Sequence, residues 1–157
     1  MYTKPRKHNN RLVNRRQRKG ASVVELAVTS PLLLLLLLGT IDGGQYVNSF
    51  QTISNASREG ARVAARATTS TATEIENSVM DYLSGAFSRV PPATLNAAIT
   101  IEVSDAEGVP LVNLGGVPTG AAVQVSVSLQ FDAVRAIPGL DELDDRTIEV
   151  STIMRRE

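Results

Sequence analysis

The fold of this chain is decided by residues 15–42, which read RRQRKGASVVELAVTSPLLLLLLLGTID. A cluster of positive charge is followed, from Ala21 to Ile41, by 21 residues whose only charged side chain is Glu25. At about 1.5 Å rise per residue, a helix of this length spans roughly 30 Å, the thickness of the hydrocarbon core of a bilayer. We therefore expect a transmembrane helix over residues 21–41.

The charge is distributed unevenly along the chain. Residues 1–19 hold eight basic side chains and no acidic one, whereas the chain from Gly20 onward holds eight basic and sixteen acidic residues, a net charge of −8. Basic residues beside an apolar span stay on the cytoplasmic side. A basic tail can also bind nucleic acid, but this one has Tyr2 as its only aromatic residue and adjoins the span. We expect residues 1–20 to be a cytoplasmic leader and expect no nucleic-acid partner.

A cleaved secretory signal is the first alternative to a permanent anchor. The Arg15-Arg16 pair permits a twin-arginine interpretation. The apolar run is longer than a usual signal core, and residues 39–44 lack an A-x-A pattern. We expect the span to remain on the protein, with Pro31 as a point where the helix can kink.

Several classes of chemistry are excluded by composition. The chain has no cysteine, which removes disulfides, thiolate metal sites and cysteine nucleophiles. His8 is the single histidine and lies in the leader, so a histidine-based triad or metal cluster in the rest of the chain is excluded. No phosphate-binding loop, nucleotide fingerprint or nucleophile elbow occurs. We expect a protein that is not an enzyme, with no catalytic, cofactor-binding or metal-binding residues, no cofactor and no small-molecule substrate.

The helical pattern continues beyond the span. Over residues 42–67, apolar and small side chains recur at steps of three and four, which predicts an amphipathic helix with one buried face: Val47, Phe50, Ile53, Ser54, Ser57, Ala61, Ala64 and Ala65. A second, short helix is predicted over residues 74–88, with Thr73 as N-cap and Glu76 completing a capping box. Pro91-Pro92 is expected to end it.

Three alternating segments follow, near residues 97–104, 121–131 and 147–154. Strict alternation of apolar and polar side chains is typical of strands in an antiparallel sheet with one buried face. The predicted fold class is α+β, with a long N-terminal helix packed on a small antiparallel sheet of about three strands. Residues 42–157 would form the exported part, and its thin core predicts low stability in isolation.

Glu25 has two interpretations. A carboxylate in hydrocarbon costs on the order of 3 kcal/mol and therefore needs a partner or an escape route. It lies about 7 Å from the start of the span, within snorkelling reach of the interface, and it can pair with Lys19 or Arg18 of its own helix. Alternatively, cleavage between Gly20 and Ala21 would give Ala21 an α-ammonium. In a bundle of staggered helices this ammonium would pair with Glu25 of a neighbour and fix the register.

These residues are similar to a known family. Gly20-Ala21-Ser22-Val23-Val24-Glu25 behind a basic leader resembles a prepilin processing site with glutamate at the fifth mature position. With Pro31–Gly39 and the NASREGAR segment, Asn55–Arg62, the stretch resembles the TadE-like minor pseudopilins of the tight-adherence (Flp-type) pilus system. The C-terminal residues Met154, Arg155 and Glu157 resemble the family's M-R-x-E ending.

The resemblance implies a processed subunit of a pilus or secretion filament in the bacterial inner membrane. The implied partners are a prepilin peptidase, other pilins and pseudopilins, the inner-membrane assembly platform and the lipid bilayer. The chain would cross the membrane once, with its C-terminal part outside and with incorporation into a pilus as a further expectation. Leu26 departs from the aromatic residue found in many processed relatives, so an uncleaved single-pass anchor displaying a small interaction domain is the alternative.

Two charged groups complete the candidates. Arg58, Arg62 and Arg66 recur at steps of four and predict a basic stripe on one helix face, either solvated with local pairs to Glu59 or docking on an acidic face of a partner pilin. An acidic loop does not match the spacing of an EF-hand, and we expect it to be solvated; it holds Asp141, Glu142, Asp144 and Asp145. A G-x-x-x-G step at Gly39 and Gly43 would permit close helix contact or act as a joint.

Overall fold

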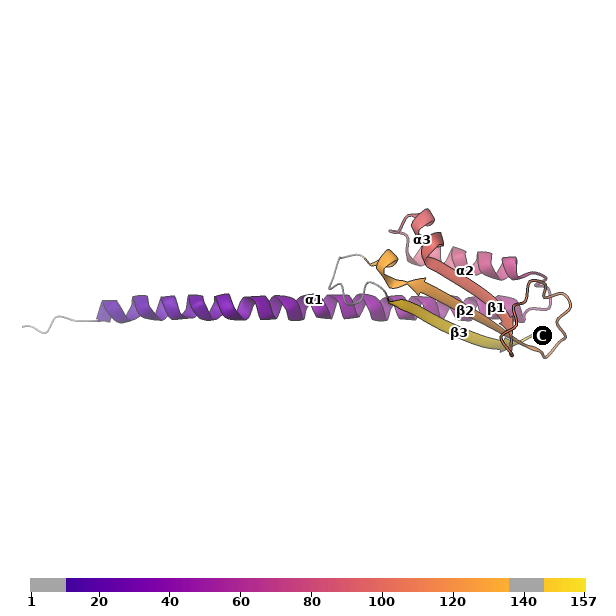
Figure 1. Ribbon diagram of the computed structural model, residues 1–157, viewed down its shortest axis with the longest axis horizontal. Coiled ribbons are helices and arrows are strands. Elements are labelled where there is room, and N and C mark those ends of the chain that lie inside the picture. Colours follow the sequence, from indigo (N-terminus) through magenta and orange to yellow (C-terminus); the bar gives the residue numbers. More distant parts are fainter. Residues whose placement is uncertain (1–10, 136–145) are drawn as a thin grey trace, which may run out of the picture. The chain divides into compact units, whose positions relative to one another are not determined.

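The computed structural model describes residues 11–135 and 146–157, with side chains from residue 20 onward except that of Ala21. The chain divides into two units, residues 1–40 and 41–157. Helix α1, Arg11–Ala65, contributes residues to both. Figure 1 shows the order of the elements along the chain.

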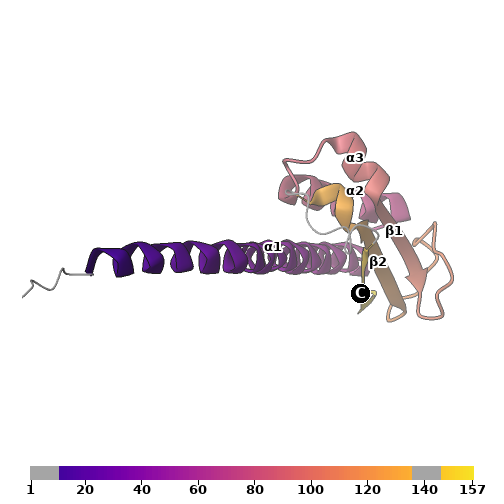
Figure 2. The same cartoon turned by 60° about the vertical axis from the view of Figure 1, so that its left-hand side comes forward.

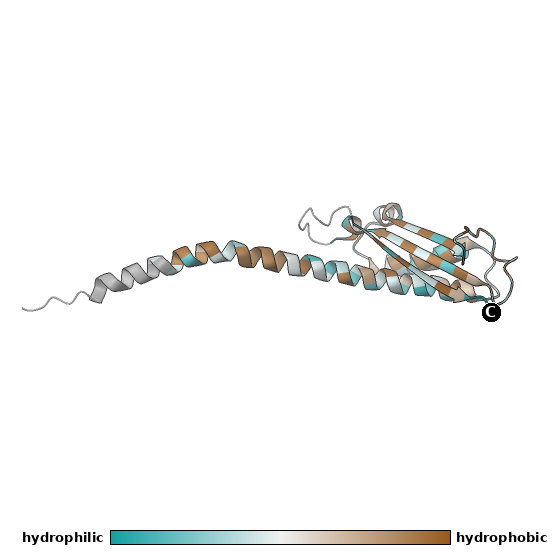
Figure 3. Cartoon of the chain, turned by 60° about the horizontal axis from the view of Figure 1, so that its bottom comes forward, coloured by the Kyte–Doolittle hydropathy of each residue, from teal (hydrophilic) through white to brown (hydrophobic). Residues whose placement is uncertain are grey.

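In the first unit, the described residues are helical through Pro31, and the apolar side chains from Val23 to Leu37 are exposed. Among the described residues, one helix is long and apolar enough to cross a membrane. Figure 3 shows this apolar stretch of α1 in brown. The hydroxyls of Thr29 and Thr40 donate to the carbonyls of Glu25 and Leu36, at 2.9 and 2.8 Å. Bonds of this kind satisfy a hydroxyl inside a helix that has no water around it.

The second unit places helices on one face of a three-stranded antiparallel sheet. The elements after α1 are α2 (Ala72–Ala86), α3 (Pro92–Ala98), β1 (Ile99–Asp105), β2 (Ala122–Gln130), the 3-10 helix η1 (Phe131–Val134) and β3 (Thr147–Arg155). The strand order is β1-β2-β3, so β2 is central. Helix α3 lies against η1 and the start of β1 (Figure 2). The α+β class and the three antiparallel strands predicted from the sequence are confirmed.

The register puts alternate side chains of β2 into the core. Val125 faces Val103 of β1 and Thr152 of β3, whereas Ser126 faces Glu102 and Ser151 on the polar side. Figure 3 shows the resulting alternation of colour along the strands. This is the pattern of a sheet that is buried on one face and wet on the other.

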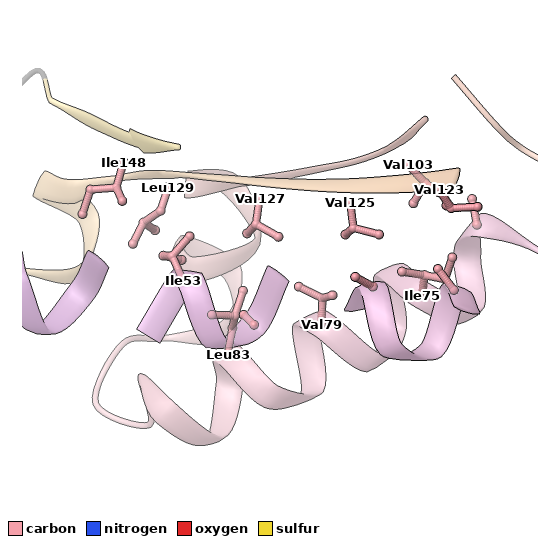
Figure 4. Close-up of a cluster of buried hydrophobic side chains, with 14 of the residues drawn as sticks. Ile53, Ile75, Val79, Leu83, Val103, Val123, Val125, Val127, Leu129 and Ile148 are labelled. Atoms are coloured by element: carbon pink, nitrogen blue, oxygen red, sulfur yellow. The ribbon is translucent and has the colours of Figure 1, made fainter. Parts of the chain in front are cut away.

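The core lies between the sheet and the two helices. Figure 4 shows Val125 and Val127 pointing from β2 toward Ile53 of α1 and Val79 of α2, all completely buried. Gly60 allows the close approach of these layers, because a Cβ atom there would lie 2.6 Å from Val79 Cγ2 and 3.0 Å from Val125 Cγ1. Ser57 joins α1 to the sheet through Val125 O at 2.8 Å and Thr152 Oγ1 at 2.9 Å.

The predicted face of α1 needs a correction. Val47 and Phe50 are 54% and 45% exposed, whereas Asp42, Ser49 and Ala56 are buried. The apolar side chains of Val47 and Phe50 led to the predicted face, but this part of α1 packs mainly through small residues, which let its backbone approach the sheet closely. The predicted positions from Ile53 to Ala64 are buried, apart from a half-buried Ser54.

The second helix also begins earlier than predicted. Its N-cap is Thr71, and Thr73 lies inside α2. The Thr71 hydroxyl contacts the Glu74 carboxylate at 3.4 Å and makes no side-chain cap bond to the backbone. The Thr73–Glu76 capping box is therefore wrong. Thr71 is held by a bridge to Asn113 of the β1–β2 connection, a long-range contact that fixes where α2 starts.

Candidate functional site

The Gly20–Ala21 bond lies inside α1. No atom lies within 4 Å of the position that a Cβ would occupy at Gly20, the helix's own backbone apart. Packing among the described residues therefore does not require glycine here.

Glu25 is exposed on α1 in apolar surroundings. Val24 and Leu26 beside it are each 64% exposed. No described side chain forms an ion pair with its carboxylate; the side chains of Arg18 and Lys19 lie outside the described set. If lipid surrounds this face, the carboxylate needs a cation from the leader, the interface or a neighbouring molecule.

The Asn55–Arg62 segment of α1 has small residues on its buried side and arginines on its exposed side. Its small residues Ala56, Ser57, Gly60 and Ala61 are buried against the sheet and α2. Its arginines, Arg58 and Arg62, are exposed on the other side of α1. The segment therefore docks the helix on the sheet and presents charge outward at the same time.

The three predicted arginines form an exposed stripe, and one of them has a local partner. Arg62 Nε donates to Glu59 Oε2 at 2.9 Å, and its Nη2 contacts Glu59 Oε1. The hydrogen bond from Arg62 holds the pKa of Glu59 below its ordinary value, and the same bond raises the pKa of Arg62. Arg58 and Arg66 form no ion pair with any described residue. The local-pair interpretation thus accounts for Arg62, and two cations of the stripe are left for other partners.

Arg58 also borders a shallow hollow. The hollow measures about 290 Å³ and is lined by Phe50, Gln51, Ser54, Asn55 and Arg58. The outer face of α1 in the second unit therefore combines an exposed apolar ring, neutral polar groups and cations, a mixture typical of protein-binding surfaces.

Sequence reasoning missed a buried ion pair. Arg135 Nε lies 3.3 Å from Asp42 Oδ1, with only 3% and 4% of the two side chains exposed. Tyr46 packs edge-on against Phe131 beside it, with ring centroids 5.3 Å apart. These contacts tie the first residues of α1 in the second unit to η1. The sequence marked Asp42 only as the outer flank of the span, and no periodicity could indicate its distant partner.

Sequence reasoning also missed the role of Arg156. This side chain is buried, and its Nη2 donates to Thr69 O at 2.7 Å and to Ala67 O at 3.3 Å. The Glu157 amide donates to Ala65 O at 2.8 Å. The Glu157 amide thus bonds the last carbonyl of α1, and Arg156 holds the segment that follows the helix. Of the three residues singled out there, Arg155 and Glu157 are exposed and Met154 is partly buried.

The remaining candidates form no site among the described residues. The acidic loop at Asp141–Asp145 lies outside them. Within residues 11–135 and 146–157, no group of three or more His, Cys, Asp or Glu side chains could hold a metal ion. Gly39 and Gly43 are exposed, and apart from their own helix no atom lies within 4 Å of the position that a Cβ would occupy at either residue.

Comparison with known proteins bears on the Gly20–Arg62 part of this geometry. The family model described as TadE-like protein matches residues 20–62, from the glycine before Ala21 to the end of the NASREGAR segment. The chain carries a TadE-like segment. This associates it with the Tad pilus system, whose TadE-like proteins are structural components. No curated protein and no solved structure matches the chain. The TadE-like segment contains Glu25, Gly60 and two of the three exposed arginines.

Proposed function

We propose that this protein is a minor pseudopilin of a Flp-type pilus or secretion system, cut by a prepilin peptidase between Gly20 and Ala21. The observation that carries the proposal is the start of the TadE-like match at Gly20, five residues before a carboxylate exposed on an apolar helix. A prepilin peptidase cuts at this kind of boundary. The mature chain would then begin with Ala21.

Cleavage gives Glu25 a function. The new α-ammonium of one subunit lies at the start of its helix, and a neighbouring helix that is axially offset presents Glu25 at the same depth. In hydrocarbon the pairing of these charges is strong, whereas either charge alone is costly. The pair therefore favours one stagger over others and sets the register of assembly.

The basic leader and the apolar helix support an orientation with the N-terminus in the cytoplasm and residues 42–157 outside the inner membrane. In this arrangement the second unit is the interaction surface. Its exposed arginines dock on an acidic face of another pilin or pseudopilin, and the inner-membrane assembly platform receives the anchored subunit. The chain then contributes to initiating, capping or priming the filament.

The register role is tested with Glu25→Ala, with Thr29→Ala as a control in the same helix. We expect Glu25→Ala to insert into the membrane normally and to be lost from assembled filaments or pilus complexes. The control should assemble, because Thr29 bonds only to its own helix. Incorporation of Glu25→Ala at the wild-type level would contradict the register role.

A second candidate is an uncleaved single-pass anchor that displays residues 42–157 to partners in the envelope. It is favoured by the helical state of residues 11–21, which continues through the proposed cleavage point. In this case Glu25 snorkels to the interface, and Glu25→Ala leaves insertion and partner binding unchanged.

A further inference from the structure

The outer face of α2 mirrors the basic stripe of α1. Glu74 and Asp81 are exposed, and they project away from the buried side formed by Ile75, Val79 and Leu83. Seven residues separate the two acids, so they lie about 10.5 Å apart along the helix. Arg58 of α1 and Arg66, the residue directly after the end of α1, are eight positions apart, which is about 12 Å at the rise of a helix. The spacing of the two acidic residues therefore nearly matches the spacing of the two arginines.

The two helices run in opposite directions within one molecule. Gly60 of α1 lies against Ile75 and Val79, near the start of α2, whereas Gln45 and Ser49 share a cavity with Phe87, just after its end. Two copies anchored in one membrane with the same polarity would thus place α2 of one copy antiparallel to α1 of the next. Antiparallel alignment brings Arg66 opposite Glu74 and Arg58 opposite Asp81.

The same alignment, extended by one helical turn beyond Arg58 and Asp81, brings two further positions opposite each other. Four residues from Arg58 toward the membrane lies Ser54, and four residues from Asp81 lies Gly85. Gly85 is exposed and has no atom within 4 Å of a Cβ position apart from its own helix backbone. A small residue opposite a glycine lets two helices approach closely, so this end of the contact meets no obstacle.

We infer that the Arg58–Arg66 stripe binds the Glu74–Asp81 face of a second copy of this chain. This contact rests on the proposed pilus function and names the acidic partner surface. It joins two different surfaces and is therefore heterologous, so a pair of bound copies leaves one stripe and one acidic face open. Contacts of this type continue into a ring or a helical array and do not stop at a two-fold dimer.

The absence of cysteine makes a direct test possible. Ser54→Cys and Gly85→Cys are introduced together into the full-length protein in its native membrane, and disulfide formation is started with a copper oxidant. We expect a ladder of dimers, trimers and larger products from the double variant, and no dimer from either single variant. A dimer from Ser54→Cys alone would show a two-fold contact and overturn the inference, as would a double variant without a ladder.

Charge reversal tests the pairing itself in this double-cysteine background. Arg58→Glu should reduce the cross-linked fraction by about fivefold or more, and adding Asp81→Arg should restore it, because the reversed pair attracts again. Arg155→Glu and Glu149→Arg, at exposed positions of β3, are matched controls and should change the cross-linked fraction little. Loss with Arg58→Glu that Asp81→Arg does not restore would overturn the pairing of the Arg58–Arg66 stripe with the Glu74–Asp81 face.

Failure of this contact is distinguishable from failure of the proposed function. The N-terminus of the cross-linked and monomeric species is determined in the same samples. A processed chain that gives no ladder overturns the contact alone. A chain that gives the ladder but still begins at Met1 overturns the processing and keeps the contact.

Discussion

Asp42 and Arg135 form a buried ion pair at the point where α1 enters the second unit, with Arg135 Nε 3.3 Å from Asp42 Oδ1. The pair connects the helix to η1, the short element that follows the central strand. The pair therefore anchors the second unit to α1 from the first residues of that unit onward.

Breaking this pair should be costly, because the Arg135 guanidinium stays buried after the Asp42 carboxylate is removed. We expect Asp42→Ala to lower the free energy of unfolding of the second unit by about 3–5 kcal/mol. Chemical denaturation of the detergent-solubilised protein, followed by near-UV circular dichroism, measures this. The exposed Asp132→Ala is the control, since its carboxylate lies 3.9 Å from the same arginine. Equal stability of both variants would refute a stabilising role for the buried pair.

Gly60 should tolerate no added methyl group. A Cβ atom would lie 2.6 Å from Val79 Cγ2, so Gly60→Ala should destabilise the protein by about 1–3 kcal/mol through overpacking. Val79→Ala in the same chain should recover part of the loss by making room. Gly85→Ala, on the exposed face of α2, should instead stabilise by about 0.5–1 kcal/mol. Thermal unfolding of the three variants measures these stability changes. A Gly60→Ala variant as stable as the wild type would contradict the close packing at Gly60.

Substitutions of Arg156 and Arg155 should differ sharply in their effect on stability, although the two residues are adjacent. Arg156→Ala removes the donor to Thr69 O and Ala67 O and should cost about 1.5–3 kcal/mol. Arg155→Ala removes an exposed side chain and should stay within about 0.5 kcal/mol of the wild type. Limited proteolysis gives a second readout, because loss of the Arg156 hydrogen bonds should expose the segment 66–72 to the protease. Identical cleavage rates for the two variants would be the contrary result.

Glu59 should titrate below the usual range of a glutamate. The hydrogen bond from Arg62 lowers its pKa in the folded protein, so the interaction stabilises the fold above the unfolded pKa and is lost as the pH falls through the folded pKa. NMR titration of the Glu59 carboxyl carbon measures the value directly. Arg62→Gln should raise the pKa of Glu59 toward its ordinary range. The control is Arg89→Gln, at an exposed arginine after the end of α2, and it should leave the pKa of Glu59 unchanged. An unaltered pKa in Arg62→Gln would contradict the assigned cause.

The strands were predictable because they follow a period of two. Val123, Val125 and Val127 alternate with Gln124 and Ser126, and this pattern alone identifies the central strand and its buried face. Helix α3 was not predicted, since Pro91-Pro92 was interpreted only as the end of α2. Proline is also favoured in the first turn of a helix, and Pro92 is the first residue of α3.

The sequence singles out candidate site residues only where the signal is local. Gly20, Ala21 and Glu25 stand out because a charge interrupts an apolar run, and the arginine stripe stands out by its four-residue steps. The buried partners of Asp42 and Arg156 lie far away in sequence, so local patterns do not reveal them. Val47 and Phe50 were assigned to the wrong face because helical periodicity identifies a face but not what covers it.

The central claim is that the mature chain begins at Ala21. Mass spectrometry of the N-terminus of the membrane-extracted protein, from cells with and without the prepilin peptidase, tests it most directly. The account predicts a chain that begins at Ala21 when the peptidase is present and at Met1 when it is absent. A chain that begins at Met1 in both cells would contradict the account and leave Glu25 as a snorkelling residue of a permanent anchor.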